Sequence, residues 1–174
     1  MAKRIFDIVL AGIALTVFLP LFIAISVFIK FDSDGPIFYL GERVGLYGKL
    51  FRIYKFRTMQ KDAEAYGTTT AKGDPRITRT GRFLRKSKVD ELPQLLNILK
   101  GEMSFVGPRP EVEEHTNEYS QEERLILSVR PGITDYSSIR FISLDEVLGS
   151  DNPHQVYLSS VRAEKNMLRL KYVR

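Results

Sequence analysis

The chain has 174 residues and a mass of 20.0 kDa, which is the size of one globular domain. Its composition, with 44% hydrophobic and 27% charged residues, is that of a globular protein and excludes a disordered or fibrous one. It contains no cysteine and only two histidines, which excludes disulfide stapling, thiolate zinc sites and cysteine catalysis and disfavours a histidine-rich metal site. The formal net charge is +5, and residues 1–100 carry 17 Lys and Arg against 9 Asp and Glu, so we expect an anionic partner such as lipid, nucleic acid or a phosphorylated substrate.

An uncharged apolar run of 22 residues occupies positions 8–29. As a helix it would be about 33 Å long, close to the roughly 30 Å of a bilayer core. A signal peptide is disfavoured, because its apolar region is shorter and ends in small residues, whereas this run ends in Phe28 and Ile29 before Lys30. A buried helix is also disfavoured, because a small domain cannot surround so long an apolar run on all sides. The run therefore predicts a membrane segment.

Two membrane topologies remain open for this segment. Pro20 lies in its middle and removes one backbone hydrogen bond of a helix, although prolines also occur in spanning helices. Lys3 and Arg4 precede the run and Lys30 follows it, and positive residues favour the cytoplasmic side at both ends. A spanning helix and a re-entrant helix broken near Pro20 are equal alternatives on these residues alone.

The rest of the chain predicts an α+β fold that is mostly helical and has a small β-hairpin. Two β-branched and aromatic runs, residues 37–40 and 50–56, flank a Gly-rich stretch and form the hairpin. Polar residues 59–66 form a short helix at most, followed by a loop over residues 67–75. Apolar periodicity and Gly or Pro boundaries predict helices at residues 77–88, 92–99, 111–129, 144–148 and 155–172. The predicted organisation is a membrane-inserted helix over residues 1–31 and a single domain over residues 32–174.

Basic residues recur every three positions through the helix predicted at residues 77–88. They are Arg76, Arg79, Arg82, Arg85 and Lys88. Such a row gives a broad basic stripe, which on its own favours a solvated face or a contact with anionic lipid. The alternative is a phosphate clamp, because a guanidinium group can bind two phosphate oxygens at once.

Two carboxylates and one rigid arginine are further candidates. Asp90 precedes a periodic helix, and an N-cap role for Asp90 with Glu91 in the first turn is the favoured interpretation from local physics. The alternative is that the pair holds Mg²⁺ and that one carboxylate attacks phosphorus. Arg109 lies between Pro108 and Pro110. It is either a surface arginine in a plain turn or an arginine that the two prolines hold in place to bind an anion. His115, on a polar segment, is expected to be solvated.

A series of short strings, in order from residue 3 to residue 134, resembles the bacterial sugar transferase family, the monotopic phosphoglycosyl transferases of the small single-domain type. Each string alone is weakly specific, but the ordered series is very specific. The strings are Lys3–Asp7, Gly35–Phe38, Tyr54–Met59, Asp74–Thr78 with Gly81 and Arg82, Asp90–Leu95 with Asn97, Gly101–Pro110 and Pro131–Thr134.

The resemblance implies a re-entrant helix and a domain on the cytoplasmic face of the bacterial inner membrane. It implies transfer of a sugar 1-phosphate from a UDP-sugar to undecaprenyl phosphate, with Mg²⁺ and release of UMP, as the first membrane step of exopolysaccharide, O-antigen or glycoprotein assembly. Asp90 would be the nucleophile and would carry a covalent phosphosugar, Asp90 and Glu91 would hold the metal, and Arg85 and Arg109 would bind phosphate. Further candidate contacts to nucleotide or lipid phosphate are Lys55, Arg57, Arg76, Arg82, Pro108 and Pro110.

The chain departs from the family pattern in three places. Leu19 precedes the membrane proline where the family often has Ser, residues 135–140 replace a Gln-containing stretch, and we would expect a further C-terminal stretch after Arg174.

Two other functions compete with the enzyme. A non-catalytic membrane-anchored adaptor that binds anionic lipids would explain the apolar run and the basic stripe, whereas a nucleic-acid binder has no use for a membrane segment and is not expected.

Overall fold

A computed structural model describes residues 2–63, 73–142, 144 and 153–174. The chain divides into two compact units, which are described separately below. Unit 1 comprises residues 1–41, 52–67 and 75–101, and unit 2 comprises residues 42–51, 68–74 and 102–174. The described residues form mostly helices with two small two-stranded sheets, which confirms the predicted α+β class.

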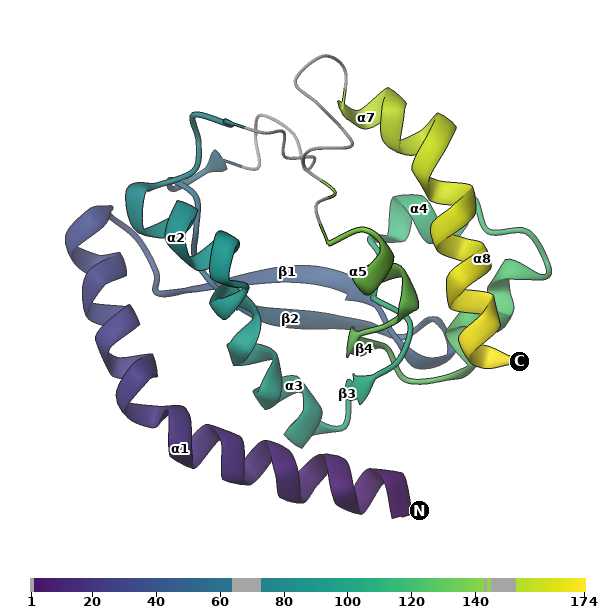
Figure 1. Ribbon diagram of the computed structural model, residues 1–174, viewed down its shortest axis with the longest axis horizontal. Helices are drawn as coiled ribbons and strands as arrows, with labels where there is room; N and C mark the ends of the chain where they lie inside the picture. Colours follow the sequence, from purple (N-terminus) through teal and green to yellow (C-terminus); the bar gives the residue numbers. More distant parts are fainter. Residues whose placement is uncertain (1, 64–72, 143, 145–152) are drawn as a thin grey trace. The chain divides into compact units, whose positions relative to one another are not determined.

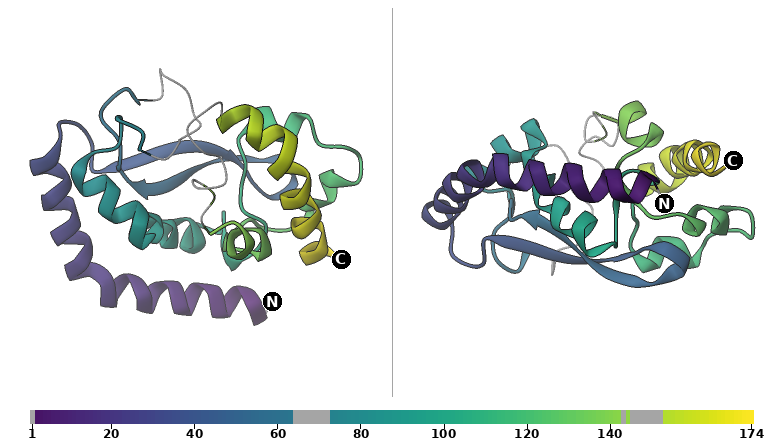
Figure 2. Two further views of the ribbon diagram at one scale, coloured as in Figure 1. Left: turned by 45° about the horizontal axis from the view of Figure 1, so that its top comes forward. Right: turned by 90° about the horizontal axis from the view of Figure 1, so that it is seen from below.

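The N-terminal helix of unit 1, α1 (Ala2–Asp32), contains the apolar run. The helix is continuous through Pro20, so the predicted break is not confirmed, although Figures 1 and 2 show α1 bending partway along its length. By length and composition α1 could cross a membrane, and only 11% of its most apolar 18-residue window is buried. Large apolar side chains such as Val17, Phe28 and Phe31 are exposed, which is unlike the core helix of a soluble protein.

Helix α1 packs against two later helical elements of unit 1, as Figure 1 shows. Ile25 and Ile29 form a buried cluster with Phe56 and Leu84. These two elements are α2 (Arg79–Ser87) and α3 (Leu95–Lys100), and the 3-10 helix η3 (Val89–Gln94) lies between them in the chain. Their positions confirm the helices predicted at residues 77–88 and 92–99. The Thr78 hydroxyl accepts from the Gly81 N–H at the start of α2, and Gly101, with φ +87°, ends α3.

The predicted hairpin is confirmed. Strands β1 (Phe38–Val44) and β2 (Leu50–Phe56) pair in one sheet and are joined by the short 3-10 turn η1 (Leu46–Gly48). The Gly45 N–H donates to the Lys49 carbonyl at 2.8 Å and closes the turn. Beyond β2, Met59 forms an isolated bridge with Ile77, and residues 59–63 contain no α-helix. Residues 64–66 of that predicted short helix, and residues 67–72 of the predicted loop, lie outside the described residues.

Unit 2 contains a second, parallel sheet, formed by β3 (Ser104–Val106) and β4 (Gly132–Thr134). Ser104 pairs with Gly132. A Cβ atom at Gly132 would clash with the backbone of Gly107, so glycine permits the close approach of the two segments. Asp135 then begins the short helix α5 (Tyr136–Arg140) by accepting from the Ser138 N–H at 2.6 Å.

The single helix predicted at residues 111–129 is wrong. The structure has α4 (Glu113–Asn117) and a separate 3-10 helix, η4 (Glu123–Ser128). Between them, Ser120 and Glu123 form two local hydrogen bonds: the Ser120 N–H donates to the Glu123 carboxylate at 2.8 Å, and the Glu123 N–H donates to the Ser120 hydroxyl at 3.2 Å. This reciprocal pair offers the backbone an alternative to one continuous helix and lies where the predicted helix is interrupted.

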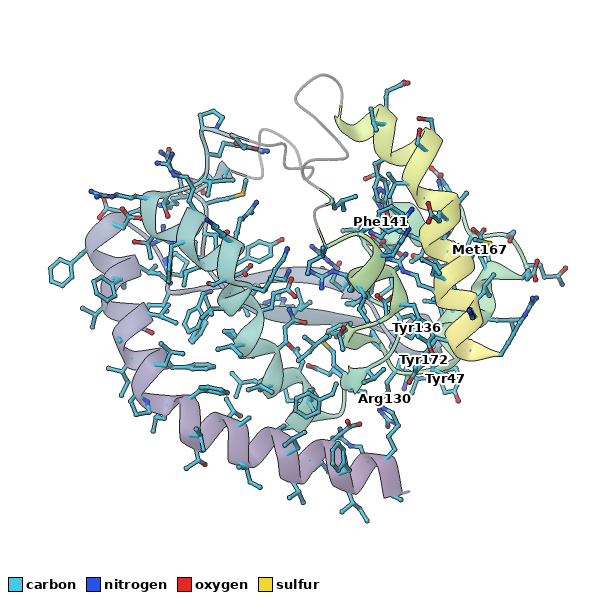
Figure 3. The ribbon with its side chains drawn as sticks, in the orientation of Figure 1. Tyr47, Arg130, Tyr136, Phe141, Met167 and Tyr172 are labelled. Carbon is cyan, nitrogen blue, oxygen red and sulfur yellow. The ribbon has the colours of Figure 1, made fainter. Side chains whose placement is uncertain are left out.

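The C-terminal helix predicted at residues 155–172 is confirmed. It consists of three consecutive helical segments, α7 (Pro153–Val156), the π-helical η5 (Tyr157–Val161) and α8 (Arg162–Val173). Met167 projects from the exposed side of α8 (Figure 3), whereas Lys165 and Arg169 are buried. The Tyr172 hydroxyl donates to the Val106 carbonyl at 2.9 Å and ties α8 to β3. Of the helix predicted at residues 144–148, all but Leu144 lies outside the described residues.

Candidate active site

Asp90 is the second residue of η3, immediately beyond the end of α2. The chain reverses at Lys88, which has φ +58° in the left-handed region and whose N–H donates to the Arg85 carbonyl. Lys88 is also the N-cap residue of η3, with no side-chain capping bond. The favoured local interpretation of Asp90 as an N-cap is therefore wrong. Asp90 is instead a carboxylate that is only 8% exposed.

Glu91 is paired with a lysine from the hairpin. The Lys55 Nζ donates to the Glu91 Oε1 at 2.8 Å, and both side chains are largely buried. Charges held together away from bulk water interact strongly with one another and with any phosphate that enters. The structure thus brings together two predicted site residues that are 36 positions apart in the chain.

Arg85, near the end of α2, contacts the segment that follows β2. Its Nε donates to the Thr58 hydroxyl at 2.8 Å. Lys55 and Thr58 therefore hold Glu91 and Arg85, respectively, from one four-residue stretch of chain. We call the set Lys55, Thr58, Arg85, Asp90 and Glu91, which contains the predicted catalytic carboxylates, the catalytic corner.

Asn97 ties α3 to β2, the strand that carries Lys55. Its side chain is fully buried, its Oδ1 accepts from the Tyr54 N–H at 3.0 Å, and its Nδ2 donates to the Arg52 carbonyl at 2.8 Å. These bonds satisfy backbone groups of β2 on either side of Ile53 and hold the strand that carries Lys55. Asn97 belongs to one of the strings that resemble the sugar transferase family, but no role could be predicted for it from the sequence, because its partners lie more than 40 residues away.

Three other predicted phosphate contacts in unit 1 have different surroundings. Arg57 is 6% exposed, and its guanidinium donates to backbone carbonyls of residues 33–36. Arg76 donates to the Ala63 carbonyl at 2.9 Å. Arg82 is exposed and lines a pocket of about 480 Å³, together with Asp32, Ser33, Asp34, Gln60, Lys61, Pro75, Ile77, Thr78 and Arg79. The predicted basic stripe is thus divided, because Arg76 binds a backbone carbonyl, Arg82 lines the pocket and Arg85 binds Thr58.

In unit 2, the segment with Arg109 is held by buried carboxylates. The Arg109 N–H donates to the Asp135 Oδ2 at 3.0 Å, and Asp135 is 3% exposed. Two residues further, Glu111 accepts from the Tyr157 hydroxyl at 2.9 Å and from the Arg169 guanidinium. The predicted rigid turn therefore has supports on both sides. Pro108 is buried and Pro110 is half-buried within the same segment.

The charged groups around Glu111 shift one another's pKa values. Burial by itself would raise the pKa of Glu111, but the Arg169 charge, a hydrogen bond with His115 and the Lys165 charge hold that pKa well below its usual range. Burial lowers the pKa of Lys165 to about 8, although Glu111 opposes this shift. The expectation that His115 is solvated is wrong, since its ring stacks on Tyr157 and its Nδ1 lies 3.3 Å from the Glu111 carboxylate.

A pH-dependent contribution to stability is expected from Lys165. Between pH 8 and about 10.4 the unfolded chain keeps the lysine proton while the folded chain loses it, so stability rises with pH in this window. Compared with Lys165→Met, the natural chain should gain about 1–2 kcal/mol in the free energy of unfolding between pH 8 and pH 9.5. Urea unfolding followed by circular dichroism measures this gain, with Lys171→Met, an exposed lysine of α8, as control. Parallel pH curves for the natural chain and Lys165→Met would contradict the expectation.

The residues present fit a magnesium ion of the substrate-bridging kind. No cluster of three or more His, Cys, Asp or Glu side chains with metal-binding geometry occurs in the described part of the chain. Mg²⁺, however, commonly takes one or two carboxylates and completes its shell with water and substrate phosphates. Asp90 and Glu91 are adjacent carboxylates, so they would be the two hard oxygen ligands of such an ion.

Comparisons with known proteins agree with the pattern of strings. The family model described as bacterial sugar transferase matches residues 1–169. A UDP-N-acetylgalactosamine-undecaprenyl-phosphate N-acetylgalactosaminephosphotransferase of Aeromonas hydrophila is 44% identical over 141 residues, which cover 79% of this chain and 33% of that protein. A UDP-glucose:undecaprenyl-phosphate glucose-1-phosphate transferase of Xanthomonas campestris is 45% identical over 147 residues, which cover 79% of this chain and 30% of that protein.

The exopolysaccharide production protein ExoY of Rhizobium meliloti is 43% identical over 150 residues, which cover 77% of this chain and 66% of ExoY. The chain therefore spans about a third of the Aeromonas and Xanthomonas proteins and about two thirds of ExoY.

Proposed function

The chain belongs to the bacterial sugar transferase family, and from this premise we propose that it transfers a sugar 1-phosphate from a UDP-sugar to undecaprenyl phosphate. The observation that carries the proposal is the catalytic corner, in which a buried Asp90 adjoins the Lys55–Glu91 ion pair. The same unit carries α1, whose exposed apolar surface suits a lipid-borne acceptor. The names of the relatives support the reaction class, and because they include both glucose and N-acetylgalactosamine transfer, we propose no particular sugar.

In the proposed reaction, an Asp90 carboxylate oxygen attacks the phosphorus atom that bears the sugar. A new Asp90 O–P bond forms, the bond from that phosphorus to the bridging oxygen breaks, and UMP leaves with this oxygen. The undecaprenyl phosphate oxygen then attacks the same phosphorus, and Asp90 leaves as a free carboxylate. Two displacements replace one difficult transfer between two anions. The products are UMP and a sugar linked to the lipid through a diphosphate.

The repulsion between Asp90 and the diphosphate must be offset for this attack to occur. Lys55 and Arg85 supply positive charge in the catalytic corner, where largely buried side chains limit screening by water. Mg²⁺, held by Asp90 and Glu91, would supply further charge neutralisation at the phosphates when bound. The role of Arg109 as a second phosphate-binding arginine stays a prediction.

We further propose that both ends of α1 lie on the cytoplasmic side of the membrane. Near its start, the Arg4 guanidinium donates to the Ile98 carbonyl at 2.7 Å, and at its end the Asp32 carboxylate accepts from the Thr80 N–H at 2.7 Å. Both partners belong to unit 1. A helix that crosses a roughly 30 Å hydrocarbon core has its ends on opposite sides, where they could not bind one polar unit. These contacts favour the re-entrant alternative.

Cysteine labelling tests this topology, because the chain has no native cysteine. Ala2→Cys and Asp34→Cys should both be protected from a membrane-impermeant thiol reagent in intact cells and both react after the cells are opened. Labelling of position 2 from outside, with position 34 protected, would show a spanning helix and refute the proposal.

The proposed reaction is tested directly with a panel of UDP-sugars. The purified chain, supplied with undecaprenyl phosphate and Mg²⁺, should release UMP and form a lipid-linked product with at least one donor. Release of UMP must require the divalent ion and be lost on chelation. If no donor in a broad panel yields UMP while the chain still binds anionic vesicles, the lipid-binding adaptor is the better description.

A further inference from the structure

A buried arginine fixes the point at which α1 meets the rest of unit 1. The Arg57 Nε donates to the Pro36 carbonyl at 2.6 Å, its Nη2 donates to the Ser33 carbonyl at 2.8 Å, and its Nη1 donates to the Asp34 carbonyl. All three acceptors belong to the segment that directly follows α1. A planar guanidinium group can reach three carbonyls around one loop, whereas a lysine ammonium group presents its donors from a single point.

Two further contacts hold the same segment. The Asp32 carboxylate accepts from the Thr80 N–H at the start of α2, and the Lys30 Nζ donates to the Gly35 carbonyl at 2.9 Å. Gly35 has φ +122°, and a Cβ atom placed there would lie 3.2 Å from Arg57 Nη1. The loop therefore depends on a glycine both for its backbone conformation and for the close approach of the guanidinium group. We call residues 32–36 with Arg57 the α1 joint.

The α1 joint and the catalytic corner share one short stretch of chain. Lys55 pairs with Glu91, Arg57 binds the joint, and Thr58 accepts from Arg85. The stretch is held as a strand end, because the Arg57 N–H donates to the Ile37 carbonyl at 2.9 Å. These bonds hold the catalytic corner together by itself, so a looser joint would let the corner move as a whole relative to α1 without changing the contacts within it.

We propose that Arg57 is a positioning residue that couples the exit of α1 to the catalytic corner and so sets the height of Asp90 relative to the phosphate of a membrane-embedded acceptor. The proposal rests on the proposed function. In the first half-reaction the donor arrives from water, and the height of the corner above the lipid is irrelevant. In the second half-reaction the acceptor phosphate is fixed at the headgroup level, so a displacement of about 1 Å lowers the rate. Loosening the joint should therefore impair the second step selectively.

The test compares the two half-reactions in three variants that loosen the joint by different means. Arg57→Lys replaces the guanidinium group, which donates to three carbonyls, by a single ammonium group. Asp32→Ala removes the acceptor of the Thr80 N–H, and Gly35→Ala places a methyl group against the Arg57 guanidinium. Arg52→Lys, an exposed arginine of β2, is the matched control. The readouts are formation of the Asp90 adduct from labelled UDP-sugar without acceptor, transfer to undecaprenyl phosphate in nanodiscs, and transfer to a short, water-soluble prenyl phosphate.

We expect transfer to undecaprenyl phosphate to fall at least tenfold in the joint variants, while adduct formation and transfer to the soluble acceptor stay within about twofold of the natural chain. Equal losses in both half-reactions would make Arg57 merely structural and overturn the proposal, as would unchanged transfer to undecaprenyl phosphate in all three folded variants. If the natural chain forms neither adduct nor product with any donor, the proposed function itself fails, and this outcome is distinct from a loss confined to the variants.

Discussion

Replacement of Asp90 by Asn is expected to lower the rate of sugar-phosphate transfer by about 10³-fold or more. The amide has nearly the same shape as the carboxylate but carries no charge and is a very weak nucleophile. Asp90 does not cap a helix, so no loss of a capping bond complicates the result. The melting temperature, followed by circular dichroism, should stay close to that of the natural chain.

The adduct itself gives the more decisive measurement. The natural chain, given labelled UDP-sugar and no acceptor, should retain a sugar phosphate on the peptide that contains Asp90, and Asp90→Asn should retain none. Asp62→Asn is the matched control, since it makes the same chemical change at an exposed position of unit 1. If the natural chain shows no adduct and Asp90→Asn turns over at a near-normal rate, Asp90 is not the nucleophile.

A second large effect is expected from two charges placed on the exposed face of α1. Ile13 and Val17 are 56% and 65% exposed and lie one helical turn apart. An Asp near the centre of a membrane helix costs about 2.5–3.5 kcal/mol, so Ile13→Asp with Val17→Asp should shift membrane partition by about 10⁴–10⁵-fold. Transfer to undecaprenyl phosphate should fall by at least about 100-fold, whereas formation of the Asp90 adduct from soluble donor should persist.

Substitution is a better test here than removal of α1, because Ile25 and Ile29 belong to the buried cluster of unit 1. The control is Ile13→Leu with Val17→Leu, which keeps the surface apolar. Flotation with vesicles and circular dichroism report membrane binding and folding separately. A double Asp variant that still floats with vesicles and transfers at the natural rate would show that α1 is not the contact with lipid.

Elements governed by neighbours in the chain were predictable. The β-branched runs around three glycines predict the hairpin, and the end of α3 at Gly101 follows from its left-handed backbone. Local patterns gave a wrong prediction where a competing local bond exists, as in the reciprocal Ser120–Glu123 pair that precedes η4. Asp90 illustrates the same limit, since the reversal at Lys88 places it inside η3 rather than at a helix cap.

The sequence by itself determined the apolar N-terminal helix, its basic flanks and the family strings, because charge, hydrophobicity and turn residues act over a few neighbouring positions. Only the tertiary structure decided how the charged side chains are used. The Arg57 side chain is chemically suited to bind phosphate but binds the backbone carbonyls after α1, whereas Lys55 pairs with Glu91. Arg4 binds the carbonyl of Ile98, 94 residues away. Such partners depend on which distant segments pack together, because a buried charge must find its counterpart wherever folding brings one within hydrogen-bonding distance.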